Sequence, residues 1–259
     1  NEKVRMGIIG CGGIANGKHM PSLKKVAECE MVAFCDIIVS RAEEAAKKFG
    51  TADAKVYEDY KDLLKDETID VVHVCTPNRS HSFITVDALE AGKHVYSEKP
   101  LGADLDEGIE LVRLAEEKGL WIGGAPDTFF GGGAQLARTV LDSGMVGKPT
   151  MVSAFLSRSY RHERFYAGDY KRFAFCRHGG IIFDMGAYYL TELVFLLGGI
   201  SAVSGFSQIR HPDRTYENPA CPLYGTPMTV ETPNNVTGSL LFESGVLGQI
   251  TMTSEGGCT

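Results

Sequence analysis

In the first 123 residues, short apolar runs alternate with longer segments in which apolar residues recur every three or four positions. Short runs rich in β-branched and aromatic residues are typical of buried strands, and the wider spacing is typical of amphipathic helices. Strands that alternate with helices in this way predict a parallel sheet covered on both faces. The predicted strands are Val4–Ile9, Glu30–Asp36, Val71–Cys75, His94–Tyr96 and Leu120–Gly123.

Two predicted helices of this half have recognisable starts. Ser40 is followed three residues later by Glu43, and Asp104 by Glu107, which is the spacing of a capping box. Gly119 stands where the second of these helices should end, and glycine is the residue most often found just past a helix C-terminus. We therefore expect helices that begin after Ser40 and after Asp104.

After residue 123 the pattern changes to mixed helical and strand-like segments. The predicted elements are a helix at Gly133–Leu141, a strand at Thr150–Ser157, an apolar helix at Phe183–Leu197, and two strands, Val236–Phe242 and Val246–Thr253, joined by a tight Gly-containing turn. The predicted fold class is α/β. Residues 1–123 are predicted to form a doubly wound parallel sheet, and residues 124–259 an α+β domain with a mostly antiparallel sheet.

Composition narrows the class of protein. The 259 residues are 44% hydrophobic and 23% charged, which predicts a soluble globular protein. The net charge of −7 provides no positive field for a phosphate backbone, so we expect no nucleic-acid partner. No apolar run reaches the ~18 residues of a membrane helix. Seven scattered cysteines without a C-x-x-C pair predict reduced thiols, no metal site and a cytoplasmic location.

A glycine-rich turn follows the first predicted strand. Gly10-Cys11-Gly12-Gly13-Ile14-Ala15 has the form G-x-G-x-x-A of dinucleotide-binding turns. Gly10 permits the tight turn, Gly12 lets the backbone approach a pyrophosphate, and small Ala15 lets helix and strand pack closely. Gly13 and Ile14 lie where the N–H groups of the helix N-terminus face the phosphates. The alternative is a glycine-rich turn that binds no nucleotide.

Asp36 follows this turn by 21 residues and ends the second predicted strand. An acidic residue at this distance binds the ribose hydroxyls of NAD, and its charge repels the 2′-phosphate of NADP. NAD is therefore the expected cofactor. Arg41, a few residues further on, keeps NADP open as the alternative.

Turns at the ends of later predicted strands carry further motifs. These are TPNRSH at Thr76–His81, GKHVYSEKPL around Lys99 and GGIIFDMGAYYL at Gly179–Leu190. With GIIGCGGIA near the start, they make the sequence resemble the Gfo/Idh/MocA oxidoreductase family. The resemblance implies an NAD(P)-dependent enzyme that acts on CH–OH groups of sugars, polyols or related alcohols. The expected cofactor-binding residues are Gly10, Gly12, Gly13, Ile14, Ala15, Asp36, Thr76, Pro77, Asn78, His81, Glu98 and Lys99.

The resemblance also implies the catalytic residues. In that family the lysine of Glu-Lys-Pro, here Lys99, lies near the nicotinamide and the reacting hydroxyl. The family motif Asp-x-x-x-His reads Asp184-x-x-x-Tyr188 here, so the chain resembles the tyrosine-containing branch. Tyr188 is expected to exchange the hydroxyl proton, with the charge of Lys99 lowering its pKa, and Asp184 to bind a second hydroxyl. The alternatives are a surface lysine, a helix-capping Asp184 and a Tyr188 packed in the core.

Several residues keep two interpretations. Asp127 and Thr128 line the substrate cleft or belong to a loop shaped by its glycines. His81 begins a helix or lines the cofactor cleft, whereas His73 is expected to be a packed strand residue. His178 reaches the substrate or replaces a loop glycine. The basic stretch Arg158–Arg177 is a solvated loop or binds an acidic substrate.

The resemblance has three further consequences. Relatives continue well beyond the equivalent of residue 259, so the second domain is expected to be incomplete. The open sheet of that domain predicts a homodimer or higher homo-oligomer. Two other functions stay open: a non-catalytic dinucleotide sensor, and an enzyme that holds its cofactor tightly and shuttles hydride between two sugars.

Overall fold

The computed structural model describes residues 3–102, 104–158, 175–177 and 179–256. It divides the chain into two compact units, residues 1–125 and 126–259. The domain boundary predicted from the sequence lies two residues before this division.

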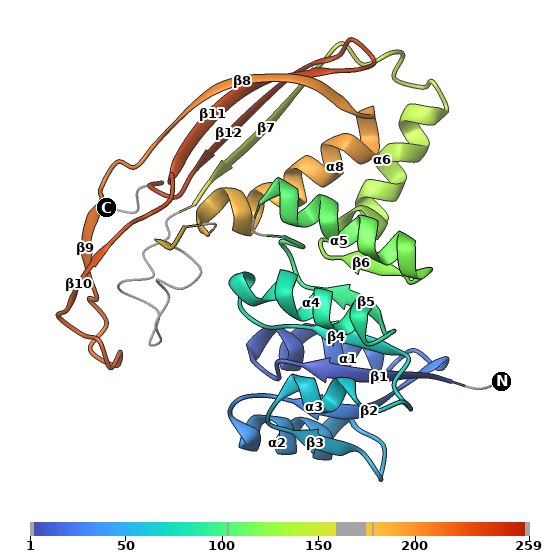
Figure 1. Cartoon of the computed structure of the whole chain (residues 1–259). Helices are drawn as coiled ribbons and strands as arrows, with labels where there is room; N and C mark the ends of the chain where they lie inside the picture. Colours follow the sequence, from blue (N-terminus) through green and yellow to red (C-terminus); the bar gives the residue numbers. More distant parts are fainter. Residues whose placement is uncertain (1–2, 103, 159–174, 178, 257–259) are drawn as a thin grey trace. The chain divides into compact units, whose positions relative to one another are not determined.

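The first unit is built on a six-stranded sheet in the order β3-β2-β1-β4-β5-β6 (Figure 1). Each neighbouring pair in this sheet is parallel, which confirms the predicted doubly wound α/β fold. The edge strand β3 was not predicted. The strands are β1 (Val4–Ile9), β2 (Cys29–Cys35), β3 (Lys55–Tyr57), β4 (Val71–Val74), β5 (His94–Ser97) and β6 (Ile122–Gly124).

Helices cover both faces of this sheet, as the alternation of strands and helices predicted. On one face, η1, α1 and α2 bury a cluster that includes Ile8, Met20 and Phe34. On the other, α3, α4 and α5 bury a cluster that includes Leu63, Val72 and Leu89. The helical segments are η1 (Ala15–His19), α1 (Met20–Leu23), α2 (Val39–Phe49), α3 (Tyr60–Leu64), η2 (Asn78–Ser80), α4 (His81–Glu90) and α5 (Leu105–Lys118).

One of the two predicted helix starts is confirmed and the other is wrong. The Asp104 carboxylate accepts the N–H of Glu107 at 3.1 Å, and α5 ends at Gly119, whose φ is +65°. In contrast, α2 begins before Ser40, at Val39, and no side chain caps it. The earlier start of α2 has a local cause, because the Asp36 carboxylate accepts the N–H of Ile38 at 2.9 Å and so fixes the backbone just before the helix.

The second unit has a mixed four-stranded sheet in the order β7-β12-β11-β8 and a separate antiparallel ribbon of β9 and β10. In the four-stranded sheet, β11 pairs antiparallel with β8 and with β12, whereas β7 pairs parallel with β12. The predicted α+β unit with a mostly antiparallel sheet is therefore confirmed. The strands are β7 (Met151–Ser157), β8 (Ile200–Gln208), β9 (Asp213–Thr215), β10 (Pro227–Thr229), β11 (Asn235–Phe242) and β12 (Leu247–Thr253).

The helix α8 packs its apolar side chains against one face of the four-stranded sheet (Figure 1). This core includes Ile181, Leu193, Phe242 and Met252. The predicted hairpin between β11 and β12 is confirmed, and its turn uses Gly245 at a φ of +85°. The helical segments of this unit are η3 (Thr128–Phe130), α6 (Gly132–Asp142), η5 (Ile182–Gly186) and α8 (Ala187–Leu197).

Alternate residues of this sheet point away from the core and stay exposed. Phe155 and Thr251 are paired, as are Thr237 and Phe206, and these pairs form one row on the outward face. The outward large apolar side chains are Met151, Phe155, Phe206, Leu241 and Leu247. The helix α8 covers the core side of β7, β12 and β11, whereas Val203 on the same side of β8 is exposed. On the outward face the large apolar side chains are interspersed with polar ones, because Thr251 and Thr237 separate Phe155 from Phe206.

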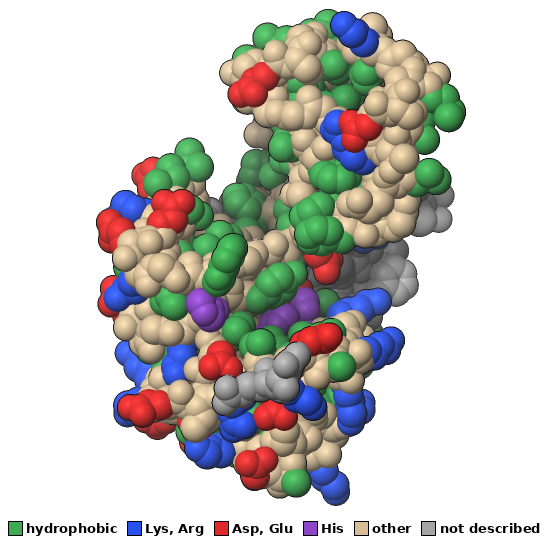
Figure 2. Space-filling model, turned by 90° about the vertical axis from the view of Figure 1, so that its right-hand side faces the viewer, with side chains coloured by type: hydrophobic (Ala, Val, Ile, Leu, Met, Phe, Trp, Pro, Cys, Tyr) green, Lys and Arg blue, Asp and Glu red, His purple; other side chains and the backbone are tan. Residues whose placement is uncertain are grey.

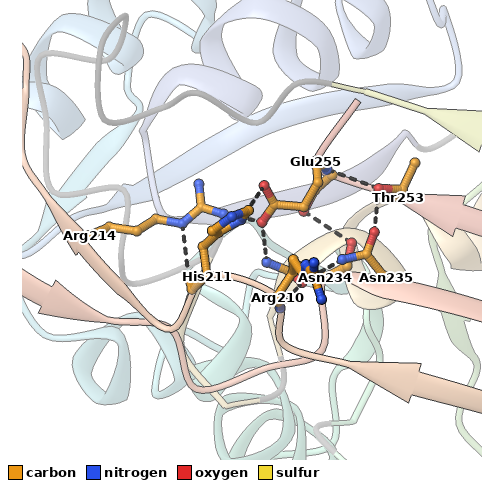
Figure 3. Close-up of polar contacts among 8 residues, drawn as sticks. Arg210, His211, Arg214, Asn234, Asn235, Thr253 and Glu255 are labelled. Carbon is orange, nitrogen blue, oxygen red and sulfur yellow. Dashed lines mark hydrogen bonds and ion pairs between the residues drawn. The ribbon is translucent and has the colours of Figure 1, made fainter. Parts of the chain in front are cut away.

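A polar network holds the end of this sheet to the β9–β10 ribbon (Figure 3). The Glu255 carboxylate accepts hydrogen bonds from Asn234 and Arg214, and His211 Nδ1 lies 3.2 Å from its second oxygen. The Arg214 guanidinium also stacks 4.7 Å from the centroid of the Phe175 ring. These contacts tie elements that are far apart in the sequence, and sequence analysis did not identify them.

Figure 2 shows acidic and basic side chains interspersed with one another, most densely in the lower part of the view. Among the described residues, no helix combines the length and the apolar character needed to cross a membrane. The six described cysteines are all free thiols, and all but Cys29 are buried.

Candidate active site

The first unit has a topological switch point at the carboxyl ends of β1 and β4. These strands are neighbours, but the chain continues from β1 toward β2 and β3 and from β4 toward β5 and β6. In open α/β sheets, ligands bind in the crevice that this divergence creates. The candidate cofactor residues follow the ends of β1, β2, β4 and β5, so the fold gathers them at one edge of the sheet.

The glycine-rich turn begins directly after β1. Gly10 has a φ of +92°, and a Cβ at this position would lie 2.8 Å from the backbone carbonyl of Cys75. The turn therefore needs glycine here for two reasons, its conformation and the close approach of the chain after β4. A Cβ on Gly12 or Gly13 would meet nothing within 4 Å, so the backbone of these residues borders open space. That space suits the approach of a pyrophosphate.

Asp36 lies at the end of β2 and is 8% exposed. One carboxylate oxygen accepts the N–H of Cys11 at 2.9 Å, and the other accepts the N–H of Ile38 at 2.9 Å. Asp36 thus fixes the glycine-rich turn to the end of the second strand. Each carboxylate oxygen has a second lone pair, so the group can still accept hydrogen bonds from ribose hydroxyls.

Asn16 stabilises the same turn and was missed by sequence analysis. Its side-chain amide donates to the carbonyls of Cys11 at 2.7 Å and Gly12 at 3.1 Å. Ala15, next to it, is fully buried under the sheet, where a larger side chain would separate helix and strand. An asparagine just after G-x-G-x-x-A is a local signal that could have identified this contact.

The turn after β4 contains Thr76, Pro77 and Asn78. The Thr76 hydroxyl accepts a hydrogen bond from Ser80 at 2.8 Å, which closes the turn before α4. His81 begins α4 and is 1% exposed. Its ring nitrogens lie 2.7 Å from the Thr76 carbonyl and 2.8 Å from the Pro100 carbonyl. His81 therefore links the turn after β4 to the turn after β5.

Glu98 organises the turn after β5 that carries Lys99. The carboxylate is 9% exposed, with Oε1 2.7 Å from His19 Nε2 and Oε2 accepting the Lys99 backbone N–H at 3.0 Å. Burial raises the pKa of Glu98, but the hydrogen bond and charge of His19, together with the Lys99 N–H and charge, outweigh burial. The pKa therefore lies below its ordinary value, and Glu98 is a buried anion at neutral pH. His19 was not among the predicted site residues.

The predicted catalytic pair of the second unit lies in one continuous helical run. Asp184 lies within the π-helical turn η5, and Tyr188 lies in the first turn of α8. Both side chains are half-buried. The alternative that Asp184 caps this helix is wrong, because the helical conformation already begins before Ile182.

Tyr188 borders an open pocket of about 370 Å³ inside the second unit. The other lining residues are Thr128 from η3, Met185 from η5, and Tyr189 and Glu192 from α8. The walls combine hydroxyl groups and a carboxylate with aromatic and thioether surface. Such walls suit a small polyhydroxylated molecule, whose hydroxyls find donors and acceptors and whose C–H faces pack on the rings.

The remaining candidate residues lie in different places. Thr128 lines this pocket, whereas Asp127 and Asp184 are not among its lining residues. His178 and most of the basic stretch, residues 159–174, lie outside the described residues.

Two family models match the chain. Residues 4–123 match the model described as "Oxidoreductase family, NAD-binding Rossmann fold" of GFO_IDH_MocA. Residues 134–256 match the model described as the "GFO/IDH/MocA C-terminal domain". The two matches follow the two units of the fold.

Curated relatives include enzymes that act on sugars and polyols. Inositol 2-dehydrogenase of Salmonella typhimurium is 36% identical over 152 residues, which are 58% of this chain and 44% of that protein. The dTDP-3,4-didehydro-2,6-dideoxy-alpha-D-glucose 3-reductase of Streptomyces violaceoruber is 31% identical over 80% of this chain and 58% of its own length. The chain thus spans about half the length of these two relatives.

Other similar proteins match over nearly the whole of this chain. D-glucoside 3-dehydrogenase of Escherichia coli is 28% identical over 95% of this chain and 68% of its own length. Among solved structures, an NAD binding oxidoreductase from Klebsiella pneumoniae superposes with a TM-score of 0.83 at 25% identity, over 99% of this chain and 68% of that chain. Levoglucosan dehydrogenase in complex with NADH and L-sorbose has the same fold, with a TM-score of 0.82 at 22% identity over 98% of this chain and 68% of its own.

Proposed function

This chain belongs to the GFO/IDH/MocA oxidoreductase family, and we propose that it is an NAD-dependent dehydrogenase of a sugar, polyol or related alcohol. The reaction is the transfer of a hydride between the nicotinamide and a carbon that bears a hydroxyl or carbonyl group. The relatives named above act on substrates of this class, and the polar and aromatic pocket beside Tyr188 is suited to such a molecule.

The observation that carries the proposal is the edge of the parallel sheet in the first unit. The glycine-rich turn, the Thr76–Asn78 turn and Lys99 follow β1, β4 and β5, which are neighbouring strands. A dinucleotide-binding turn therefore shares one edge with a lysine whose backbone is fixed by the buried anion Glu98. An NAD-binding domain without catalytic function has no need of a lysine held in this way.

The residues of the first unit fit the cofactor. Gly12 and Gly13 leave room for the pyrophosphate, and Asp36 offers carboxylate oxygens to the ribose. When bound, NAD supplies the acceptor or donor of the hydride. Lys99 is proposed to hold the reacting hydroxyl by hydrogen bonding and to stabilise the negative charge that develops on its oxygen.

The second unit is proposed to supply the proton transfer. A phenol with a pKa near 10 donates a proton readily at neutral pH, and it accepts one when a nearby cation stabilises the phenolate. Tyr188 therefore acts as the acid in carbonyl reduction and as the base in alcohol oxidation. Asp184 accepts a hydrogen bond from a second substrate hydroxyl and so orients the reacting carbon.

The test is a panel of sugars, polyols and sugar acids with NAD and NADP, followed at the absorbance of the reduced nicotinamide. We expect turnover with NAD on at least one substrate. On that substrate, Tyr188→Phe and Lys99→Ala should each lower kcat by about 10²-fold or more, which is typical for the loss of an acid/base or charge-stabilising group.

Tyr189→Phe is the matched control, because this neighbouring tyrosine lines the same pocket. It should change KM more than kcat. Wild-type turnover in both Tyr188→Phe and Lys99→Ala would contradict the proposed roles. Binding of NADH without turnover on the whole panel would favour the dinucleotide sensor, and cofactor absorbance that survives gel filtration would favour the sugar–sugar oxidoreductase.

We further propose that the protein forms a homo-oligomer through the outward face of the four-stranded sheet. Five large apolar side chains alternate on this face, and each stays exposed in the single chain: Met151, Phe155, Phe206, Leu241 and Leu247. Met151, Leu247 and Leu241 lie side by side in one row, and large apolar side chains exposed together on one face are typical of an association surface. Phe155→Lys with Phe206→Lys should yield monomers in analytical ultracentrifugation, whereas a wild-type monomer would contradict the proposal.

We propose a cytoplasmic location on the chemistry of the thiols. Burial, reinforced by the charge of Asp36, raises the pKa of Cys11 to about 12, so this thiol stays protonated and unreactive. A chain with many free thiols is suited to a reducing compartment. Microscopy of the tagged protein in its host cell tests this location.

A further inference from the structure

Three potential metal ligands meet beneath the first helical segment of the first unit. His73 lies in β4 and Cys75 follows that strand, so their side chains leave the same face of the sheet. His19, the last residue of η1, lies over that face, and its ring centroid is 4.5 Å from that of His73. One donor atom of each of the three residues lies within 4.8 Å of the other two.

His73 supplies a second, independent observation. Its side chain is 4% exposed, and neither ring nitrogen has a hydrogen-bond partner among the described residues. Its ring is packed between His19 and Tyr96, whose centroid lies 4.8 Å away. Native interiors leave few polar groups in this state, because each unpaired group has lost its hydration without replacement. The His73 nitrogens therefore indicate a ligand.

The donor set defines the class of that ligand. Two imidazole nitrogens and one thiolate sulfur suit zinc and other borderline or soft cations, whereas calcium and magnesium prefer oxygen. Glu98 completes the pattern, because its Oε1 lies 2.7 Å from His19 Nε2. A histidine that binds a metal commonly donates its other ring N–H to a carboxylate, which fixes the tautomer. With Nε2–H donated to Glu98, His19 keeps the Nδ1 lone pair for a metal.

We propose that His19, His73 and Cys75 bind one zinc ion, with the fourth position open to water or a small ligand. On binding, the Cys75 thiol loses its proton to solvent and the Cys75 sulfur–zinc bond forms, so one proton is released for each zinc bound. The ion satisfies His73 and fixes η1 to β4. It also connects through His19 and Glu98 to the backbone of Lys99, and so stabilises the turn that carries this lysine.

The experiment uses the whole chain, stripped of metal by a chelator and titrated with Co²⁺ as a spectroscopic probe for zinc. We expect one Co²⁺ per chain, with the charge-transfer absorption of a cobalt–thiolate bond, and displacement by one equivalent of Zn²⁺. Cys75→Ala should abolish this absorption, and His73→Phe should weaken Co²⁺ affinity at least tenfold. Cys221→Ala, which removes a buried free thiol from the second unit, should leave both unchanged.

Two results of the Co²⁺ titration would overturn the proposal. One is a wild-type protein that binds no Co²⁺ or shows no thiolate absorption, which would leave a buried water as the partner of His73. The other is thiolate absorption that survives Cys75→Ala. If the variants do not fold, the wild-type protein is titrated with zinc in weak buffer and the released protons are measured. Release of one proton per zinc supports thiolate ligation, and no release contradicts it. None of these measurements depends on turnover.

Discussion

Lowering the pH from 7 to 5 in the presence of a chelator should destabilise the first unit, and His73 should make a contribution that can be measured separately. Burial lowers the pKa of this imidazole to about 3, with a further lowering by the charge of His19 and an opposing effect of Glu98. In an unfolded chain, the pKa of histidine is about 6.5. The folded protein therefore keeps His73 neutral at a pH where the unfolded chain is protonated.

The sign and size of the effect follow from this difference. Between pH 6.5 and about 3 the unfolded state binds a proton that the folded state excludes, so stability falls as the pH falls. Each pH unit within this window changes the free energy of unfolding by about 1.36 kcal/mol. At pH 5, about 1.5 units below the unfolded pKa, the loss amounts to about 2 kcal/mol.

The assay is urea unfolding at a series of pH values, followed by the fluorescence of Trp121. This is the only tryptophan of the chain, and it lies in the first unit. His73→Phe is the matched variant, since it keeps an aromatic ring between His19 and Tyr96 but has no titrating group. Carboxylates titrate alike in both proteins. The wild type should lose about 2 kcal/mol more than the variant between pH 7 and 5, and equal losses would refute the reasoning.

Three further predictions concern the cofactor edge. Asp36→Ser should raise KM for NAD about tenfold or more, because it removes a charged acceptor for the ribose hydroxyls; initial rates with NAD and NADP measure this. Gly10→Ala should destabilise the first unit by about 2 kcal/mol or more, since its φ is +92° and its Cβ would collide with backbone. Gly12→Ala, in contrast, should fold normally and bind NADH more weakly. Urea unfolding measures the loss of stability, and fluorescence titration with NADH measures the loss of affinity. His19→Leu should lower kcat about tenfold by leaving Glu98 without its partner, with partial rescue by His19→Gln, which keeps an N–H donor; equal kcat in both variants would contradict a positioning role.

Features set by neighbouring residues could be predicted from the sequence. The Asp104 cap and the Gly119 terminus of α5 depend on groups three or four residues apart, so the pattern contains all the information. The predicted start of α2 was wrong because Asp36, which lies outside the helix, fixes the backbone at Ile38. The edge strand β3 was not predicted because it has only three residues, which are largely exposed. It is held by pairing with β2, which is distant in sequence.

The candidate site shows the same division. The glycine-rich turn and the position of Asp36 follow from local form and spacing. The contact between His19 and Glu98 joins residues 79 positions apart, and no pattern in either segment indicates it. His73 was expected to be a packed strand residue, and its burial confirms this, but only the structure reveals that its two nitrogens lack partners among the described residues.

Four of the seven buried polar side chains described in the first unit lie at the same edge of the sheet as the motifs, whereas His73, Thr85 and Lys93 lie elsewhere. Asp36, His81, Ser97 and Glu98 are each less than 10% exposed, and each lies at or beyond the carboxyl end of a strand. Burying such groups costs stability even when they are hydrogen-bonded, and the apolar clusters on the two sheet faces do not need them. Their partners are mostly the backbone and side chains of neighbouring turns, including Cys11, the Thr76 and Pro100 carbonyls, His19 and Lys99. The need for stability does not explain why buried polar side chains lie at the carboxyl ends of the strands. A functional site explains it, because the turns of such a site must be held in fixed positions.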